Sequence, residues 1–547
     1  MKIPPAISSA LPWFLALLGG VLLPLSYPPV EWSGLVWISV APLAWAIWFT
    51  GRGCRRPWLR AAALGYVFGL AYHGGISLWL MTLTVPGQIL LTFYYAAYPA
   101  VWAVFLHAIG GGDSEEEEAR WLGSFHNLGL CALGAAGWVA TEWLRGVIFP
   151  AFGWDGLGVA LYRNIPLIQI SDITGVGGLS FLVALVNLML PVTIRRLYLE
   201  IGRGVRRPHY DFTLTMFVVA LSWTYGLRQV LTPERPSTDL RFAAVQANVP
   251  QNVRNDLASE SEVLEYYKRH TQTALAMRPD LILWPETATP RPVFNDKPTW
   301  ETVEAIAKSH AGDFLFGTVF LSEEGDHNSI ALLTNRGQNA QIYHKIHLVP
   351  FGEYVPLRQG FPLIAWVVGS LVPDDFDPGP YPNVLQMGAK PIRIAPLICF
   401  EDTVGDLARR SALLGAQVFV VVTNDGWFLE SAGSRQHLAN AVFRCAENKI
   451  PMVRAANTGI TCAIDHLGSI REILRDKDGR TTIEGVLFHS LPVPNNPSPT
   501  FYGKNGEVFS VACLILALVN AGLNLQKRRK MKKSACPQPP EKEISQP

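Results

Sequence analysis

Eight apolar segments constrain the fold of this chain more than any other feature of its sequence. Seven of them follow one another within the first 227 residues, and the eighth stands alone near the other end. They comprise residues 11–25, 35–50, 61–80, 89–109, 128–148, 179–194, 212–227 and 508–525. A helix that crosses a bilayer needs about 20 apolar residues, with a lower limit of about 17. The pattern therefore predicts a multi-pass α-helical membrane protein with eight spans.

The composition agrees with this interpretation. Hydrophobic residues make up 49% of the 547 residues and charged residues only 16%, which is unusually apolar for a soluble protein of this size. The formal net charge of +2 is too small to indicate a nucleic-acid partner. The 7 cysteines show no spacing typical of a disulfide framework or a zinc site. We expect no metal and no nucleic acid.

The positively charged residues predict how the spans are oriented. They cluster after the second, sixth and eighth segments: Arg52, Arg55, Arg56 and Arg60; Arg195, Arg196, Arg203, Arg206 and Arg207; Lys527, Arg528, Arg529, Lys530, Lys532 and Lys533. Loops with an excess of lysine and arginine remain in the cytoplasm, and acidic residues such as those at 115–118 have little influence on the orientation of the spans. Both termini are therefore expected in the cytoplasm, and the polar stretch after the seventh span in the periplasm.

That polar stretch has the pattern of an α/β domain. Strands are predicted at residues 240–246, 281–284, 314–319, 330–334, 392–398 and 418–423, and helices at 261–277, 302–309, 403–414 and 437–448. The predicted division is a membrane domain at 1–227, a periplasmic domain at 228–507, the eighth span at 508–525, and a basic, then disordered cytoplasmic tail at 526–547.

Cys399 lies at the end of one of these predicted strands. A side chain in this position is held rigidly at the rim of the sheet. Only a thiolate attacks as a nucleophile, so a catalytic Cys399 needs a base and a nearby cation. Considered alone, a small cysteine that ends a strand is more often a core residue.

Two other stretches offer the base and the cation. Glu286 follows Trp284 and an apolar strand. A carboxylate placed there loses hydration, which raises its pKa and makes it a usable general base. A helix N-cap or a surface carboxylate fits this position too. Lys345 and Glu353 share a loop, residues 343–356, that is rich in proline and aromatic residues. Lys345 could stabilise an oxyanion there, and Glu353 could orient it or assist the base. A Glu, a Lys and a Cys in this order predict an acyl-transfer site.

The same segments resemble a known family. W-P-E at 284–286, K-I-H-L-V-P-F-G-E-Y-V-P at 345–356 and I-C-F-E-D at 398–402 resemble the nitrilase, or carbon–nitrogen hydrolase, superfamily. The lysine loop, with N-D-G-W-F at 424–428 and R-A-A-N-T-G-I at 454–460, is similar to the apolipoprotein N-acyltransferase family of the bacterial inner membrane. The likeness covers most of the chain.

The resemblance implies an α-β-β-α sandwich for the polar domain and a triad of Glu286, Lys345 and Cys399. It also implies a ping-pong reaction through a thioester on the cysteine. A phospholipid would donate a fatty acyl chain, and the α-amino group of an apolipoprotein's N-terminal diacylglyceryl-cysteine would accept it, in the last step of lipoprotein maturation. The family implies no cofactor, and we expect a monomer.

Further residues are assigned by the same resemblance. Glu353 matches the second glutamate of the family, Glu401 is expected to orient the site or its loops, and Trp427 to shape the acyl entrance. Substrate or lipid contacts are expected at Trp284, Trp154 and Phe400.

The chain departs from the family in two places among these residues. The family has G-F-P-W where this chain has Ala151, Phe152, Gly153 and Trp154, so only the tryptophan is carried over. It often has tyrosine after the nucleophile, where this chain has phenylalanine, so no hydroxyl role is carried over.

Two more features carry expectations. Glu142 and Arg145 are three residues apart near the end of an apolar segment, and we expect them to pair with one another. Residues 357–377 contain an apolar cluster and are a candidate lid over the site.

Two other functions fit parts of the sequence. A membrane-tethered nitrilase-type amide hydrolase would act on a water-soluble amide without lipid. A transporter with a periplasmic binding domain would need polar groups or broken helices at mid-membrane, and the apolar segments contain few. Acyl transfer is favoured, because one span would suffice to anchor a hydrolase.

Overall fold

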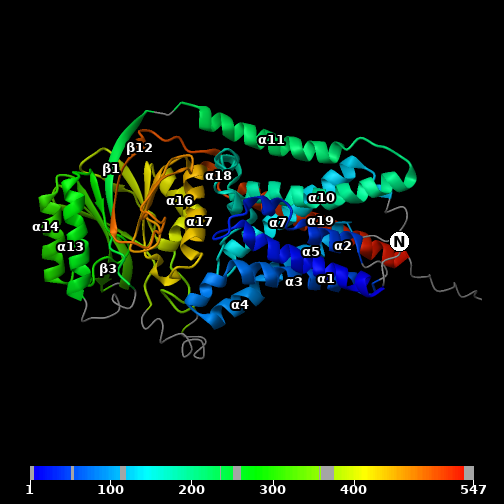
Figure 1. Cartoon of the computed structure of the whole chain (residues 1–547), viewed down its shortest axis with the longest axis horizontal. Helices are drawn as coiled ribbons and strands as arrows, with labels where there is room; N and C mark the ends of the chain where they lie inside the picture. The colour runs from blue at the N-terminus through cyan, green and yellow to red at the C-terminus, as the bar shows by residue number, and fades with distance from the viewer. Residues whose placement is uncertain are drawn as a thin grey trace, which may run out of the picture.

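The molecule is elongated, with helices at one end and β-sheets at the other (Figure 1). The computed structural model describes residues 5–50, 54–110, 119–233, 236–250, 260–323, 325–356, 358 and 375–534. Most of the candidate lid at 357–377 and the end of the predicted tail, 535–547, lie outside the described residues.

The helical end contains all eight predicted apolar segments. Its main helices are α1 (Pro5–Leu22), α2 (Ala41–Phe49), α3 (Pro57–Ile76), α4 (Val85–Tyr95), α5 (Ala97–Gly110), α7 (Ser124–Val147), α10 (Val176–Arg203), α11 (Tyr210–Leu231) and α19 (Val508–Ser534). Among the described residues, four stretches are long and apolar enough to cross a membrane: Ser9–Ser26, Val85–Gly110, Val176–Arg203 and Val508–Gln526. The helical end therefore has the character of a membrane domain.

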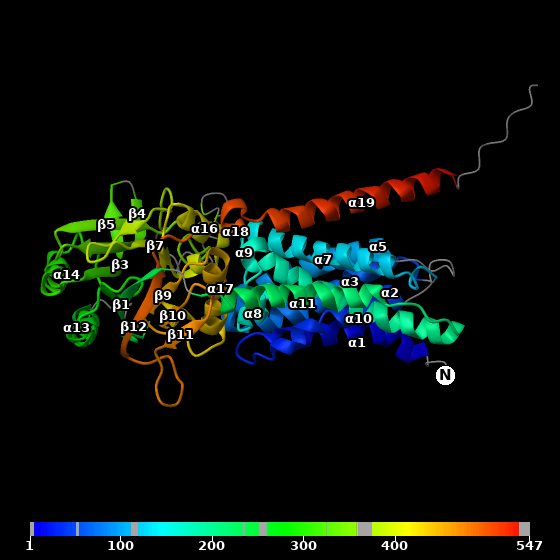
Figure 2. The ribbon, with the colours of Figure 1, turned by 90° about the horizontal axis from the view of Figure 1, so that it is seen from above.

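Short helices connect or flank these elements: η1 (Leu23–Ser26), η2 (Ser33–Trp37), η3 (Leu78–Thr82), η4 (Leu157–Leu161), α8 (Ile165–Ile168), α9 (Ser171–Thr174) and α18 (Phe501–Asn505). Helix α19 comes last in the chain and runs along the bundle beside α7 and α5 (Figure 2). The eighth apolar segment thus joins the helices of the first seven.

Small residues let α3 and α5 pack closely. A Cβ atom added at Gly65 would lie 2.5 Å from the carbonyl oxygen of Pro99, and one added at Gly69 would lie 2.7 Å from the Cα atom of Ala96. Two glycines four residues apart share one helix face and allow two backbones to approach each other.

The other end of the molecule contains two six-stranded sheets. The first has the order β12 (Gly485–Pro494), β1 (Ser237–Gln246), β2 (Leu281–Leu283), β3 (Asp313–Ser322), β4 (Gly325–Thr334) and β5 (Asn339–His344). The second has the order β11 (Ile470–Ile473), β10 (Cys462–Ile464), β9 (Met452–Ala456), β8 (Val418–Thr423), β7 (Arg393–Ile398) and β6 (Leu385–Gln386). Strands β1, β2 and β3 are parallel to one another, as are β7, β8 and β9, and the other pairs are antiparallel.

The two sheets face each other across an apolar core and are covered by helices. Phe242 and Leu283 of the first sheet belong to the same buried cluster as Ile398 and Val420 of the second. Helices α13 (Glu260–Ala276) and α14 (Lys297–Ser309) cover the outer face of the first sheet (Figure 1). Helices α16 (Gly405–Leu413) and α17 (Gly433–Asn448) cover the second and belong to the cluster that extends into the helical end. This confirms the expected α-β-β-α sandwich.

The six strands and four helices predicted for the polar stretch are all present, but six further strands of the described residues were not predicted. These strands are β5, β6, β9, β10, β11 and β12. Strand β12 pairs with β1, some 240 positions earlier in the chain, so its local sequence does not reveal its partner. Strands β6 and β10 span only two and three residues, too few for a period to be read.

The close packing of α3 and α5 predicts that Gly65→Ala will destabilise the protein. The added methyl group would collide with backbone, so the helices must separate, at a cost of about 1–3 kcal/mol. Gly129→Ala in α7 is the matched control, because nothing lies within 4 Å of its added Cβ atom. Thermal unfolding in detergent should show a lower midpoint for Gly65→Ala alone, and equal midpoints would contradict the packing.

Candidate functional site

The three residues of the predicted triad follow strands of both sheets. Cys399 directly follows β7, Glu286 lies just beyond β2, and Lys345 directly follows β5. Because the ends of these strands meet at one edge of the sandwich, side chains far apart in the sequence converge there. The charges of Glu286 and Lys345 both act on the pKa of the Cys399 thiol, so the three groups form one electrostatic unit.

Lys345 is buried between two carboxylates. Only 1% of the residue is exposed. Its Nζ atom donates to Oε1 of Glu353 at 2.8 Å and lies 3.6 Å from Oε1 of Glu286. Burial disfavours the ammonium, but Glu353 and Glu286 outweigh it and hold the pKa of Lys345 above its ordinary value. A permanent positive charge is thereby kept at the site.

Asn328 of β4 connects the two carboxylates and was not predicted from the sequence. Its Nδ2 atom donates to Oε1 of Glu286 at 2.8 Å and to Oε1 of Glu353 at 2.9 Å. The other oxygen of Glu286 accepts from the backbone N–H of Asn424 at 2.9 Å, and that of Glu353 accepts from the backbone N–H of Val349 at 2.8 Å. Both carboxylates are therefore held in place.

Cys399 sits in a strained turn. Its φ is 51°, in the left-handed region that residues with a side chain seldom adopt, and it begins the short helix η6 (Cys399–Thr403). Its side chain is only partly exposed. Burial and the negative charge of Glu286 raise the pKa of this thiol, while Lys345 lowers it. The resting group is therefore a thiol, and it needs a base before it can act as a nucleophile.

Glu401 holds the start of the lysine loop against the nucleophile's strand. Its carboxylate accepts from the backbone N–H groups of Ile346, His347 and Ile398 at 2.7, 3.0 and 2.8 Å. It also accepts from the Tyr343 hydroxyl at 2.9 Å. Burial raises the pKa of Glu401 to about 7, against the effect of these donors. One side chain thereby positions both Lys345 and Cys399.

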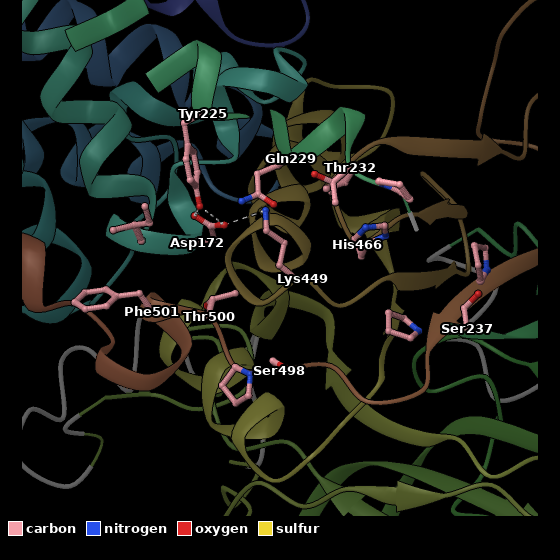
Figure 3. A pocket seen from close by; sticks show the side chains of 16 residues that line it. Asp172, Tyr225, Gln229, Thr232, Ser237, Lys449, His466, Ser498, Thr500 and Phe501 are labelled. Carbon is pink, nitrogen blue, oxygen red and sulfur yellow. Dashed lines mark hydrogen bonds and ion pairs between the residues drawn. The ribbon is translucent and has the colours of Figure 1, made fainter. Parts of the chain in front are cut away.

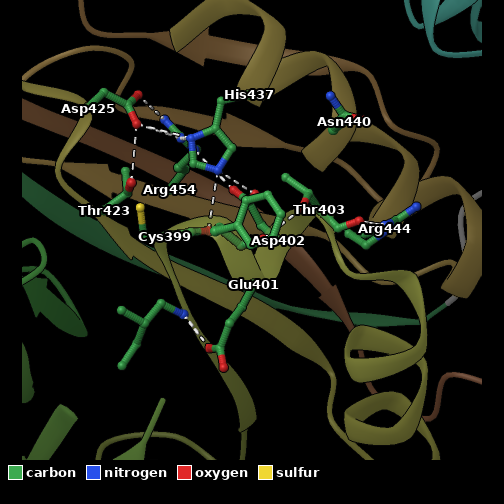
Figure 4. Close-up of polar contacts among 12 residues, drawn as sticks. Cys399, Glu401, Asp402, Thr403, Thr423, Asp425, His437, Asn440, Arg444 and Arg454 are labelled. Atoms are coloured by element: carbon green, nitrogen blue, oxygen red, sulfur yellow. Dashed lines mark hydrogen bonds and ion pairs between the residues drawn. The ribbon is translucent and has the colours of Figure 1, made fainter. Parts of the chain in front are cut away.

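A buried charge network lies beside the nucleophile (Figure 4). His437 of α17 contacts Asp402 through Nε2 at 2.7 Å and Asp425 through Nδ1 at 3.1 Å. Arg454 of β9 reaches the same two carboxylates at 3.3 and 3.0 Å. The Nε2 atom of His437 also lies 3.3 Å from the carbonyl oxygen of Cys399. The carboxylates after β7 and β8 were the sequence signal for this network, but only the fold shows their partners.

An aromatic cluster joins the nucleophile's turn to the helical end. It consists of Trp79, Phe152, Trp154, Phe400 and Phe428. Phe400 stacks with Phe152 and Trp154 at centroid distances of 5.6 and 6.3 Å. Trp79 contacts Trp154 at 5.1 Å and Phe428 at 4.8 Å. Cys399 therefore lies next to an apolar region shared by the two parts of the molecule.

The structure separates the three predicted lipid contacts. Trp154 and Phe400 both belong to the aromatic cluster next to Cys399. Trp284 is 0% exposed, and its indole N–H donates to Thr271 at 2.9 Å inside the domain core. The prediction for Trp284 is wrong, because a side chain with no exposed surface cannot touch a lipid. Trp427 is 51% exposed, and its carbonyl oxygen accepts from Thr82 of η3 at 3.2 Å.

The prediction that Glu142 and Arg145 pair with each other is also wrong. Glu142 accepts from the Trp138 indole at 2.7 Å and from the backbone N–H of Leu157 at 2.8 Å. Arg145 donates to the carbonyl oxygen of Trp154 at 2.8 Å. Both side chains therefore stabilise the connection that carries Trp154, because its buried backbone groups need partners.

Known protein families match the helical end and the sandwich of this chain separately. A family model described as the apolipoprotein N-acyltransferase N-terminal domain matches residues 19–189. One described as carbon-nitrogen hydrolase matches residues 241–485. An apolipoprotein N-acyltransferase of Geobacter metallireducens is 35% identical over 94% of this chain and 96% of its own length. Proteins of the same name from Methylococcus capsulatus and Rhodopseudomonas palustris are 33% and 29% identical, over 82% and 94% of this chain and 85% and 95% of their own lengths.

The charges around Cys399 predict how the rate of its alkylation depends on pH. Because the pKa of this thiol is raised, its reaction with iodoacetamide should keep accelerating beyond about pH 8.5, the ordinary pKa of cysteine. Glu286→Gln removes a charge that raises this pKa and should shift the profile to lower pH. Lys345→Met removes a charge that lowers it and should shift the profile to higher pH.

Mass spectrometry of the Cys399 peptide would measure these rates. Cys54 is exposed and Cys536 lies outside the described residues, so both are replaced by serine in every variant. Profiles that level off near the ordinary value, or shifts of the opposite sign, would contradict the electrostatics of the site.

Proposed function

The chain belongs to the apolipoprotein N-acyltransferase family, and we propose that it transfers a fatty acyl chain from a phospholipid to the α-amino group of the N-terminal diacylglyceryl-cysteine of apolipoproteins. The observation that carries the proposal is a partly exposed Cys399 that shares its electrostatic environment with Glu286 and Lys345 and adjoins an aromatic cluster leading to the apolar helices.

The first half of the proposed reaction forms a thioester. Glu286 takes the proton of Cys399, and the sulfur attacks the ester carbonyl carbon of the phospholipid. The ammonium of Lys345 stabilises the oxyanion that develops on the carbonyl oxygen. The ester bond then breaks, Glu286 returns the proton to the departing alkoxide, and a lysophospholipid leaves.

The second half passes the acyl chain to the amine. The α-amino group attacks the thioester carbonyl and gives a proton to Glu286, again with Lys345 beside the oxyanion. The carbon–sulfur bond breaks, and the Cys399 sulfur recovers the proton from Glu286. The product is an amide, and the free thiol is ready for another turnover.

Supporting roles follow from the contacts of the site. Glu353 fixes Lys345 through its 2.8 Å hydrogen bond. Glu401 holds the backbone at Ile346 and His347, next to that lysine. Trp154 and Phe400 contact the acyl chain from within the aromatic cluster, and Trp427 shapes the entrance from its exposed position.

We assign eight membrane crossings to the chain, with both termini in the cytoplasm. The positively charged connections support this orientation, because they would share the cytoplasmic side. The division at residues 227/228 and 507/508 then places the sandwich in the periplasm, and the protein acts as a monomer. The amide-hydrolase alternative is not favoured, because this chain matches two family models. One is the carbon-nitrogen hydrolase model, and the other is the N-terminal domain of apolipoprotein N-acyltransferases.

Trapping the acyl-enzyme tests the proposed reaction. With labelled phospholipid and no acceptor, the wild-type protein should accumulate label as a hydroxylamine-sensitive thioester. A diacylglyceryl-cysteine peptide should discharge it. Cys399→Ala should accumulate none, and Glu286→Gln should form it about 10²–10⁴ times more slowly, the usual effect of losing a general base.

The control for trapping is Glu301→Gln, whose side chain is exposed on α14, the helix that covers the outer face of the first sheet. A labelled adduct on Cys399→Ala would refute the assignment of the nucleophile. Phospholipid-independent turnover of a soluble amide, with no thioester, would instead support the hydrolase.

Cysteine labelling tests the proposed orientation. Cys54 precedes α3 on the predicted cytoplasmic side, and Asp478 lies in an exposed turn of the sandwich. In a Cys399→Ala, Cys536→Ser background, a membrane-impermeant maleimide should label Asp478→Cys in intact spheroplasts. It should label Cys54 only after permeabilisation, and the reverse pattern would overturn the orientation.

A further inference from the structure

Apart from the candidate site, the molecule has a pocket beside Lys449, the residue that directly follows α17 (Figure 3). We call it the second pocket. Its volume is about 280 Å³, and its polar lining includes Asp172, Tyr225, Gln229, Lys449, His466 and Thr500. Lys449 follows His437 by twelve positions, which corresponds to about 18 Å along the helix. The pocket is therefore separate from the acyl-transfer site.

The pocket lies where apolar helices end. Helix α9 contributes Asp172 just before α10 begins, and α11 contributes Tyr225 and Gln229 in its last turns. Phe501 of α18 borders the pocket shortly before α19 begins. In a bilayer, the ends of such helices lie at the level of the lipid headgroups.

Two buried charges of opposite sign line the pocket. Asp172 is 6% exposed and Lys449 is 9% exposed, and the Nζ atom of Lys449 lies 3.4 Å from Oδ2 of Asp172. Lys449 also donates to Oε1 of Gln169 at 2.6 Å, and the hydroxyl of Tyr225 donates to both oxygens of Asp172 at 3.0 Å. The lining thus presents one cation and one anion in fixed positions.

The surroundings of the pocket change from apolar to polar. Ile173 and Phe501 line it next to the helical end and are both exposed. The outer surface of α11 beside it is also apolar, with Leu221 and Leu231 exposed. On the side of the sandwich, the lining includes His466 and Ser237 (Figure 3). A phospholipid has the same polarity, with acyl chains at one end and a charged headgroup at the other.

We propose that this pocket binds the headgroup of a zwitterionic phospholipid that carries a primary ammonium. The phosphate accepts a hydrogen bond from Lys449, and the ammonium donates to Asp172, so the two charges of the headgroup lie beside the opposite charges of the existing Asp172–Lys449 ion pair. The volume is near the lower limit for ligand pockets, so it takes the headgroup and leaves the acyl chains along α11. This lipid attaches the sandwich to the bilayer on the side of the bundle opposite α4 (Figure 1).

Photo-crosslinking of the full-length protein tests this site. The Cys399→Ala chain is used, so that no lipid is consumed, with phosphatidylethanolamine that carries a photoreactive group near its glycerol. Cross-linked peptides should include residues 225–233 and 498–501. Phosphatidylglycerol should compete at least about tenfold less well, since it lacks the ammonium that Asp172 binds.

The decisive variant removes both charges together, Asp172→Asn with Lys449→Met, because removing one would leave the other buried without its partner. It should lower cross-linking in the pocket at least about tenfold and leave cross-links near the aromatic cluster unchanged. Lys477→Met with Glu472→Gln, both exposed on the sandwich, is the matched control. Gln229→Glu adds a negative charge near the phosphate and should also weaken cross-linking, in case the double variant does not fold.

Other outcomes would overturn the proposal. If the wild-type pocket residues form no cross-links, a headgroup site is ruled out. It is also ruled out if cross-linking is the same in the double variant and in Gln229→Glu as without these substitutions. Equal competition by phosphatidylglycerol would rule out the zwitterionic ligand, and displacement by inorganic phosphate alone would indicate a site for free anions. None of these outcomes affects thioester formation on the wild-type protein, so the two proposals fail separately.

Discussion

The ammonium of Lys345 between Glu286 and Glu353 is the interaction on which the rest of the site depends. An unpaired buried charge costs folding free energy, so the buried ammonium of Lys345 needs carboxylate partners. Glu286 lies just beyond β2, Lys345 directly follows β5, and Glu353 lies further along the lysine loop. Asn328 of β4 donates a hydrogen bond to each of the two carboxylates and holds them in place. In the proposed reaction, this ammonium stabilises the oxyanion and Glu286 exchanges the protons.

The layer of α16 and α17 makes this sandwich part of a membrane protein. One face of the layer covers the second sheet, and the other packs against the helical end. The first turns of α17 contribute His437 to the charge network beside Cys399, and Lys449, which directly follows the helix, lines the second pocket. One helix thus connects the nucleophile, the aromatic cluster and the predicted membrane surface.

The sequence was most informative where local pattern and chemistry coincide. The strands that precede Glu286 and Cys399 were predicted correctly, because a short run of apolar residues indicates a buried strand. The apolar segments lie in the helical end, where four described stretches are long and apolar enough to cross a membrane, and the number of eight spans stays a prediction. The sequence was least informative where a partner lies far along the chain. Strand β12 and the contacts of Asn328 could not be predicted for this reason, and the expected Glu142–Arg145 pair gave way to bonds with a distant connection.

The sequence by itself determined the apolar helices and the α/β alternation, and its motifs predicted a triad of Glu286, Lys345 and Cys399. Only the tertiary structure decided which side chains lie at the candidate site and which pack in the core. Trp284 stands two residues before Glu286, yet it is buried in the core, whereas Trp154, 246 positions before Phe400, stacks with the ring of that residue. Packing of the two sheets and of α17 makes that difference, because such contacts depend on distances that no local pattern encodes.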